Sequence, residues 1–190
     1  MDRNKLAIFD MDGTLFDTKN VNFHAYKQAL NECGLNVNID YDYYCKFCNG
    51  NNYKVFLPAI LPEITIEQME YVHDRKKQLY PQYLKNARIN KNLFTLINLI
   101  KNEYQIALVT TASKKNLNDI LDFFKIRNTF DFILTQEDVK HTKPNPEGFL
   151  VAMNRAGVSR KNTLIFEDSD TGIEAAEKSG ADYVRVYGYN

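Results

Sequence analysis

Cysteine is scarce in this chain of 190 residues, which contains only Cys33, Cys45 and Cys48. An odd and small number of cysteines is a poor basis for a disulfide framework, so we expect free thiols. The Cys45-Lys46-Phe47-Cys48 spacing is compatible with a zinc or dithiol pair, but a second pair is missing and the three histidines are dispersed. We therefore interpret the cysteines as side chains packed in a helical region.

Long apolar runs and an excess of either charge are also missing. No apolar stretch reaches the about 20 residues of a membrane-spanning helix, and Met1 to Lys5 lead into a strand pattern without a signal-type segment. The 24 basic and 24 acidic residues balance and are scattered, so no broad field attracts nucleic acid or an acidic membrane surface. We expect a cytoplasmic protein that binds neither; the sequence leaves its oligomeric state open.

Strand and helix patterns alternate along most of the chain, which is long enough for one well-buried core with a small inserted lobe. An apolar strand pattern at 6–9 opens the chain. Later patterns predict strands over 105–109, 130–134, 163–166 and 183–186, and helices over 93–101, 114–124, 146–156 and 171–179. This alternation is typical of an α/β fold with a parallel sheet and right-handed crossovers.

Residues 18–85 carry a different pattern, in which apolar side chains recur at helical spacing and no strand is convincing. The predicted helices cover 23–34, 41–47, 54–60 and 66–80, the last with Thr65 as a possible cap. Because the first strand must join the later sheet, we interpret 18–85 as a helical cap inserted into a core of 1–17 and 86–190. Such a cap would lie over the carboxyl edge of the sheet, where parallel sheets bind ligands.

The first strand ends in two acids one residue apart, in the sequence Asp10-Met11-Asp12-Gly13-Thr14. The turn completed by Gly13 can bring the second carboxylate back beside the first. Paired carboxylates at a strand end suit a divalent cation and an activated nucleophile. An isolated pair of this kind is more often an ordinary turn and cap, so its meaning depends on the other strand ends.

Three further strand ends or loops carry matching chemistry. Thr110-Thr111 follow the strand at 105–109, and a hydroxyl with successive backbone N–H groups there can hold phosphoryl oxygens. Lys143 lies in a loop stiffened by two prolines, from which an ammonium group can neutralise both a phosphoryl group and Asp10. Glu167-Asp168 close the strand at 163–166 and could complete a magnesium site with Asp10.

These four motifs, in this order and spread over nearly the whole chain, resemble the haloacid dehalogenase-like superfamily. The resemblance implies a Rossmann-like sheet with helices on both faces and a helical cap inserted after the first motif. It also implies the residue roles. Asp10 would be the nucleophile that forms an aspartyl-phosphate, and Asp12 the general acid and base, with its backbone carbonyl on Mg²⁺. Thr110 and Lys143 would hold the phosphoryl group, with Thr111 beside them, and Asp168, with Glu167 in direct or indirect support, would complete the metal site.

Several activities within this resemblance compete. Dehalogenases need neither magnesium nor the second aspartate, so Asp12 and Glu167-Asp168 argue against that activity. Phosphomutases resembling β-phosphoglucomutase place a histidine where this chain has Asn22 and a serine where it has Ala112. Both departures favour a phosphatase that acts on a small phosphorylated metabolite, with the mutase and a non-catalytic regulatory module as alternatives.

Substrate choice is expected to depend on the cap. Asn49-Gly50-Asn51-Asn52-Tyr53-Lys54 is a polar turn where caps of this family present a loop to the active site, so Asn52 or Lys54 could meet the leaving group. The same residues also make a good turn without any further role. Phe16-Asp17 are interpreted as the point where the chain leaves the core for the cap.

Overall fold

The computed structural model describes residues 3–35 and 37–188. The chain divides into two compact units, one formed by Met1–Asp17 with Arg88–Asn190 and the other by Thr18–Ala87. We call them the core unit and the helical unit. Within the described residues, no helix is both long and apolar enough to cross a lipid bilayer.

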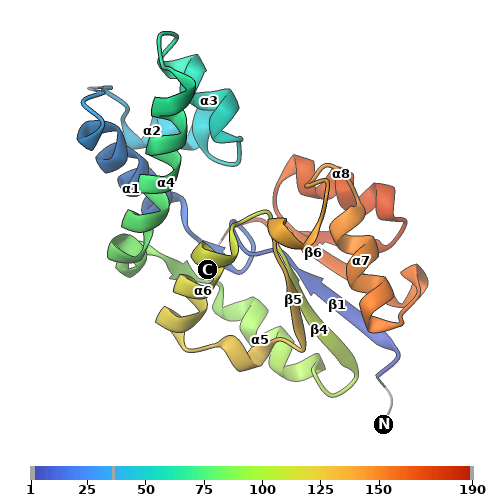
Figure 1. The fold of residues 1–190 in the computed structure, drawn as a ribbon. Coiled ribbons are helices and arrows are strands. Elements are labelled where there is room, and N and C mark those ends of the chain that lie inside the picture. Colours follow the sequence, from blue (N-terminus) through green and yellow to red (C-terminus); the bar gives the residue numbers. More distant parts are fainter. Residues whose placement is uncertain (1–2, 36, 189–190) are drawn as a thin grey trace. The chain divides into compact units, whose positions relative to one another are not determined.

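A five-stranded sheet forms the centre of the core unit (Figure 1). Its order is β5-β4-β1-β6-β7, and every neighbouring pair is parallel. The strands are β1 Lys5–Phe9, β4 Tyr104–Val109, β5 Phe132–Leu134, β6 Thr163–Glu167 and β7 Asp182–Arg185. Because the strands are parallel, the carboxyl ends of β1, β4 and β6 lie at one edge of the sheet. The predicted Rossmann-like α/β fold class is confirmed.

Helices cover both faces of this sheet, with α7 and α8 on one side and α5 and α6 on the other (Figure 1). Their bounds are α5 Lys91–Ile100, α6 Lys114–Phe124, α7 Glu147–Ala156 and α8 Asp170–Ser179. Alternation along the strands divides the apolar side chains between the faces. The face toward α7 and α8 packs on these helices in one buried cluster, which includes Leu6, Ile8, Ala107, Val109, Phe132 and Ile165 of the strands and Phe149 and Ala152 of α7.

A second sheet of two strands pairs the segment where the chain leaves the core unit with the segment where it returns to it. β2 Phe16–Asp17 pairs antiparallel with β3 Arg88–Ile89, and Arg88 Nη2 lies 2.5 Å from Asp17 Oδ2. Phe16 is fully buried and its ring stacks on Phe124 of α6. The sequence does not predict this pairing because two-residue strands are too short to show a period of two.

The helical unit contains α1 Lys19–Glu32, α2 Tyr41–Tyr43, a π-helical turn Tyr44–Cys48, α3 Tyr53–Ile60 and α4 Ile66–Tyr83. A capping box starts α4, in which Thr65 Oγ1 accepts from the N–H of Gln68 and the Gln68 side chain accepts from Thr65. The helix runs three residues past its predicted end at Tyr80, through Pro81. The Tyr83 hydroxyl donates to Gln28 of α1, a contact that anchors this last turn.

Aromatic and aliphatic side chains of α1, the π-helical turn, α3 and α4 form a separate core for this unit, which includes Phe23, Tyr26, Leu30, Tyr44, Phe56, Leu57, Val72 and Leu79. All three cysteines are free thiols: Cys48 is buried, and Cys33 and Cys45 are half-buried against the same core. Burial raises the pKa of the Cys48 thiol, which disfavours the reactive thiolate.

His73 on α4 is held in its neutral form. Its ring stacks on Tyr53 with centroids 3.8 Å apart, and its buried Nδ1 makes no hydrogen bond within the described residues. Burial, with the nearby positive charges of Lys76 and Lys77, lowers the pKa of His73 from 6.5 to about 4. Protonation therefore favours the unfolded chain, in which the imidazole keeps its ordinary pKa.

This shift predicts a pH-dependent loss of stability on the acid side. The contribution of neutral His73 is complete above pH 6.5 and is lost as the pH falls toward about 4. Because the ring is half-buried, we expect a loss of about 1 kcal/mol in the free energy of unfolding between about pH 7 and about pH 5. Urea unfolding of the wild type and of His73→Phe, which keeps a ring against Tyr53, measures it. Equal pH dependence in the two proteins would show that His73 does not contribute.

Candidate active site

Asp10 lies immediately after β1 and is 5% exposed. Its backbone N–H donates to the carbonyl of Phe166 in β6, so the residue still belongs to the sheet edge. The following turn is closed by hydrogen bonds from Gly13 N to Phe16 O and from Phe16 N to Met11 O. Asp12 is half-buried, and its backbone forms an isolated β-bridge with that of Phe16 within this turn.

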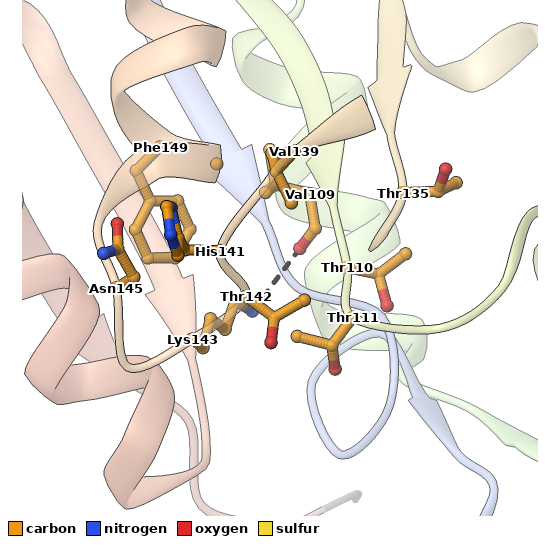
Figure 2. Close-up of a pocket in the computed structure, with 11 residues that line it drawn as sticks. Val109, Thr110, Thr111, Thr135, Val139, His141, Thr142, Lys143, Asn145 and Phe149 are labelled. Atoms are coloured by element: carbon orange, nitrogen blue, oxygen red, sulfur yellow. Dashed lines mark hydrogen bonds between the residues drawn. The ribbon is translucent and has the colours of Figure 1, made fainter. Parts of the chain in front are cut away.

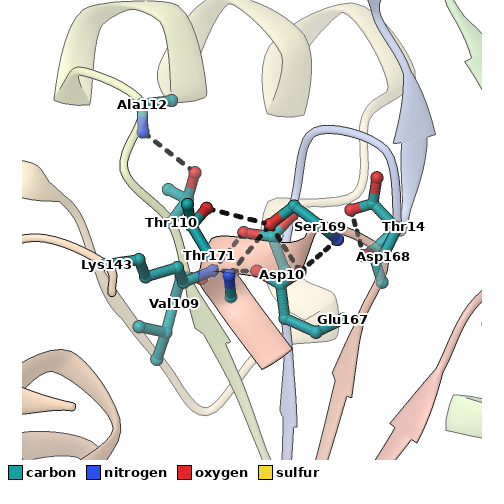
Figure 3. A network of polar contacts seen from close by, with 11 residues as sticks. Asp10, Thr14, Val109, Thr110, Ala112, Lys143, Glu167, Asp168, Ser169 and Thr171 are labelled. Atoms are coloured by element: carbon teal, nitrogen blue, oxygen red, sulfur yellow. Dashed lines mark hydrogen bonds and ion pairs between the residues drawn. The ribbon is translucent and has the colours of Figure 1, made fainter. Parts of the chain in front are cut away.

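Lys143 joins two carboxylates at the sheet edge (Figure 3). Its Nζ lies 2.5 Å from Asp10 Oδ1 and 2.6 Å from Glu167 Oε1, and donates to the carbonyl of Val109 at 3.4 Å. The side chains of Lys143, Asp10 and Glu167 are 8%, 7% and 1% exposed. Burial alone would lower the pKa of this ammonium group, but the two carboxylates hold it above its usual range.

The net effect of the same surroundings on Asp10 is to hold the pKa of its carboxyl group well above its usual value. Burial raises the pKa of its carboxyl group, and the negative charges of Glu167 and Asp168 raise it further, whereas Lys143 lowers it. The ionised form of Asp10, which a nucleophile needs, therefore depends on the ammonium group of Lys143.

The loop that carries Lys143 is fastened by Glu147, the first residue of α7. The Glu147 carboxylate accepts from the backbone N–H groups of Lys140, at 2.8 Å, and His141, at 3.0 Å, and its Oε2 lies 2.9 Å from His141 Nδ1. These donors hold the pKa of Glu147 below its usual range. Glu147 N in turn donates to Asn145 Oδ1 at 3.0 Å, so both arms of the loop are fixed.

Glu167 is fully engaged by its neighbours. While Oε1 accepts from Lys143, Oε2 accepts from both the backbone N–H of Ser169, at 2.8 Å, and its hydroxyl, at 3.0 Å. Gly172 packs directly against this carboxylate, because a Cβ atom at Gly172 would lie 1.9 Å from the Glu167 carboxyl carbon. The arrangement assigns Glu167 to holding Lys143 and the start of α8.

Asp168 projects toward the first turn instead. Its Oδ1 accepts from the hydroxyl of Thr14 at 3.1 Å, and its carboxylate fills the space where a Cβ at Gly13 would be, with Oδ2 only 2.0 Å from that position. Gly13 also has φ of +96°, which side-chain-bearing residues rarely adopt. Burial, together with the charge of Glu167, raises the pKa of Asp168 to about 6.

The two threonines after β4 differ in exposure. Thr110 is 5% exposed and its hydroxyl accepts from the backbone N–H of Ala112 at 3.0 Å, whereas Thr111 is exposed. Both line a pocket beside Lys143 whose apolar floor includes Val109 and Phe149 (Figure 2). The structure thus brings Thr110, Thr111 and Lys143 to one small cavity.

The two candidate specificity residues of the helical unit have local partners. Asn52 caps α3, since its Oδ1 accepts from Lys54 N at 2.9 Å. Lys54 Nζ lies 3.0 Å from Glu70 Oε1, and the hydroxyl of Tyr53 donates to the same carboxylate at 2.8 Å. The Lys54 side chain is 60% exposed, so this ion pair leaves its ammonium group accessible.

The charge balance of the core site fits a divalent cation. Asp10 and Glu167 pair with the ammonium group of Lys143, Asp168 adds a third carboxylate at this edge, and burial with the charge of Glu167 raises the pKa of Asp168 to about 6. Carboxylate oxygens are also the ligands that Mg²⁺ prefers. Across the described ranges, however, no three His, Cys, Asp or Glu side chains converge as a preformed ligand cluster. The carboxylate oxygens and the negative charge of the site therefore fit a divalent cation, although the described side chains do not form a complete set of ligands in this structure.

A Rossmann-like sheet with a buried carboxylate, a lysine and further acids at the carboxyl edge of its strands defines an α/β protein with a candidate catalytic site at that edge. Comparison with known proteins identifies the family within this class. The chain belongs to the haloacid dehalogenase-like hydrolase family, whose model matches residues 7–186. The family membership predicted from the four ordered motifs is confirmed.

Several similar proteins are named phosphatases, and one similar solved structure is that of a β-phosphoglucomutase-like protein. A phosphorylated carbohydrates phosphatase of Thermotoga maritima is 28% identical over 188 residues, which cover 96% of this chain and 83% of that protein. The fructose-1-phosphate phosphatase YqaB of Escherichia coli is 28% identical over 185 residues, covering 94% of each chain. The crystal structure of a predicted phosphoglycolate phosphatase from Haemophilus somnus has a TM-score of 0.86 at 25% identity, covering 100% of this chain and 88% of that one. These relatives support the expectation of a phosphoric monoester hydrolase.

The sequence does not predict the residues that position the site residues through hydrogen bonds. Thr14, Ser169 and Glu147 each bond a residue of the site or its loop, and Asn90 bonds the backbone of Thr14. Ser169, two residues after Glu167 and before a helix, has the signature of an N-cap and could have been found. Asn90 could not, because it acts on a residue 76 positions away.

Replacing Lys143 with methionine tests the ion pairs. Methionine keeps the volume of the side chain but leaves two buried carboxylates without their cation, so we expect a destabilisation of about 3 kcal/mol or more. Asp10 should take up a proton, and turnover should fall by at least about 1000-fold. Thermal unfolding and phosphatase assays measure the two effects. The exposed Lys115→Met, which loses only an ion pair with Asp119, is the control; equal behaviour of the two variants would contradict the account.

Proposed function

We propose that this protein is a Mg²⁺-dependent phosphatase that hydrolyses a small phosphate monoester through an aspartyl-phosphate on Asp10. The observation that carries the proposal is the 2.5 Å contact between Lys143 Nζ and Asp10 Oδ1. It supplies a buried carboxylate with the positive charge it needs to stay ionised, at the edge of the sheet beside Thr110. Phosphatase names among the relatives support the same reaction.

In the first step, a carboxylate oxygen of Asp10 attacks phosphorus in line with the leaving oxygen. A new bond forms between Asp10 and phosphorus as the ester P–O bond breaks, and Asp12 gives its proton to the departing oxygen. The ammonium group of Lys143 and the Thr110 side chain hold the phosphoryl oxygens in place. An electrostatic obstacle remains, because Asp10 must approach a phosphate that is itself negative.

The cation supplies the remaining positive charge on the phosphoryl oxygens when it is bound. Asp10, Asp168 and the backbone carbonyl of Asp12 are the groups that would hold it. Glu167 would act indirectly, by holding Lys143 and the start of α8, since its oxygens already accept from Lys143 and Ser169.

In the second step, Asp12 takes a proton from a water molecule as that water attacks phosphorus. The bond between Asp10 and phosphorus breaks, inorganic phosphate leaves and Asp10 is restored as a carboxylate. Asp12 is then protonated again, ready for the next ester.

We further propose that the helical unit acts as the cap that selects the leaving group. Its insertion after the first motif supports this role, as does the polar turn that ends at Asn52 and Lys54. The accessible ammonium group of Lys54 would suit a hydroxylated or anionic leaving group. A phosphorylated carbohydrate is the substrate class that the named relatives favour.

A phosphomutase is the main alternative. It would have to hold a second phosphate group and protect the aspartyl-phosphate from water. The Asn22 side chain instead donates to Thr18 at 3.3 Å, and Ala112 offers no hydroxyl. Incubation with a hexose monophosphate and traces of its bisphosphate separates the two activities: a phosphatase releases inorganic phosphate, while a mutase converts one hexose phosphate into its isomer.

Asp10→Asn tests the enzyme itself. The amide is nearly isosteric but is not a nucleophile, so we expect turnover of an aryl phosphate with Mg²⁺ to fall by at least about 1000-fold. Asp122→Asn, a change on the exposed surface of α6, should leave the rate unaltered. Removal of Mg²⁺ by a chelator should abolish wild-type turnover. An inactive wild type, or an Asp10→Asn variant as fast as wild type, would instead favour the non-catalytic regulatory module.

Asn52→Ser and Lys54→Met test the contribution of the helical unit to substrate choice. Serine still caps α3, so α3 should stay folded while the amide group is lost. We expect the ratio of kcat/KM values between sugar phosphates and an aryl phosphate to change by about tenfold, corresponding to one lost charged hydrogen bond. Lys46→Met, an exposed lysine of the same unit, is the control. A panel of phosphate esters with unaltered preferences would remove the turn from consideration.

A further inference from the structure

Asn90 is a buried amide placed where the chain re-enters the core unit, directly after β3. It is 4% exposed, and its side chain has two separate jobs. Its Oδ1 accepts from Leu93 N at 3.3 Å and so caps α5, while its Nδ2 donates to the carbonyl of Thr14 at 3.1 Å. Its backbone N–H also donates to Leu15 O at 2.9 Å. Asn90 therefore fixes the backbone of the turn that follows Asp10.

Thr14 passes this constraint to the acid at the end of β6. The residue is fully buried, and its hydroxyl donates to Asp168 Oδ1 at 3.1 Å (Figure 3). Three hydrogen bonds thus run in series, from α5 through Asn90 to the turn and on to Asp168. The other side of the Asp168 carboxylate is set by Gly13, whose missing side chain makes room for it.

The orientation of Asp168 has few other determinants. Glu167 is fixed by Lys143 and Ser169, whereas the Asp168 carboxylate accepts from the hydroxyl of Thr14 and from its own backbone N–H. A carboxylate can turn about its last bond at little cost, since such torsions are broad. Binding a cation then includes the loss of that freedom, unless the protein has already removed it.

We propose that Asn90 and Thr14 are positioning residues that hold the Asp168 carboxylate in its cation-binding orientation. This inference rests on the proposed function, in which Asp168 is a ligand of Mg²⁺. Asn90 lies after the helical unit in the chain and Thr14 lies before it, so the relay ties the two connections between the units to the metal-binding acid.

The decisive variant is Thr14→Val, which keeps the shape of the side chain and removes its hydroxyl. We expect about tenfold weaker Mg²⁺ binding, because the lost hydrogen bond ends on a charged group. At saturating Mg²⁺, KM for an aryl phosphate should stay within about threefold of wild type. Thr14→Ser, which restores the hydroxyl, should recover most of the affinity. Two readouts measure it: the Mg²⁺ concentration giving half-maximal turnover, and the rise in melting temperature that Mg²⁺ causes without substrate.

Asn90→Ser gives an independent second variant, because serine can still cap α5 but cannot reach Thr14 with an amide. It should weaken Mg²⁺ binding by about threefold to tenfold. Thr163→Val is the matched control: Thr163 is 3% exposed and its hydroxyl donates to Ser159 O at 3.0 Å, at the other end of β6. It loses the same kind of group and should bind Mg²⁺ as the wild type does.

The outcomes separate this inference from the proposed function. A wild type with neither Mg²⁺-dependent turnover nor a Mg²⁺-induced rise in melting temperature overturns both. A wild type that responds to Mg²⁺, with Thr14→Val and Asn90→Ser binding it equally well, overturns the relay alone. Weaker binding in both variants, recovery in Thr14→Ser and none of the loss in Thr163→Val support it. If Thr14→Val does not fold, Asn90→Ser decides the question on the same two readouts.

Discussion

The ammonium group of Lys143 is the constraint on which the core unit depends. It holds carboxylates from the ends of two adjacent strands, Asp10 after β1 and Glu167 in β6, in a place where water reaches none of the three side chains easily. Desolvation of three charges is expensive and is compensated only when the partners meet in good geometry. The site therefore requires a rigid loop around Lys143 and rigid strand ends around the carboxylates.

That requirement explains the surrounding structure. Glu147 fixes the loop that carries Lys143 by accepting hydrogen bonds from the backbone N–H groups of Lys140 and His141. Ser169 donates to the second carboxylate oxygen of Glu167. Gly172 is glycine because the Glu167 carboxylate lies where a Cβ would be. One lysine cannot balance three carboxylates, so the site keeps an excess of negative charge that burial makes costly. A cation at this edge would relieve it, and would meet the phosphate with positive charge.

How far the sequence predicts this arrangement depends on the length of each signal. The strands and helices of the core unit give sustained periodic patterns, and α6 begins and ends at its predicted residues, with Ser113 as its cap. Because the carboxyl ends of parallel strands lie at one edge of the sheet, the sequence alone assigns Asp10, Thr110 and Glu167 to that edge. The pairing of β2 with β3 and the hydrogen bond from Asn90 to Thr14 could not, because each joins short segments far apart in the chain and leaves no periodic trace.

The central claim is that Asp10 carries the phosphoryl group during turnover. A direct measurement is a rapid acid quench of the Mg²⁺-loaded enzyme with a phosphate ester labelled on phosphorus, followed by identification of the labelled peptide. The account predicts transient label on the peptide that contains Asp10. With an aryl phosphate, whose leaving oxygen departs without a general acid, label should accumulate more strongly in Asp12→Asn, where the base that activates water is lost. Turnover without any labelled protein, or label on a residue other than Asp10, would contradict it.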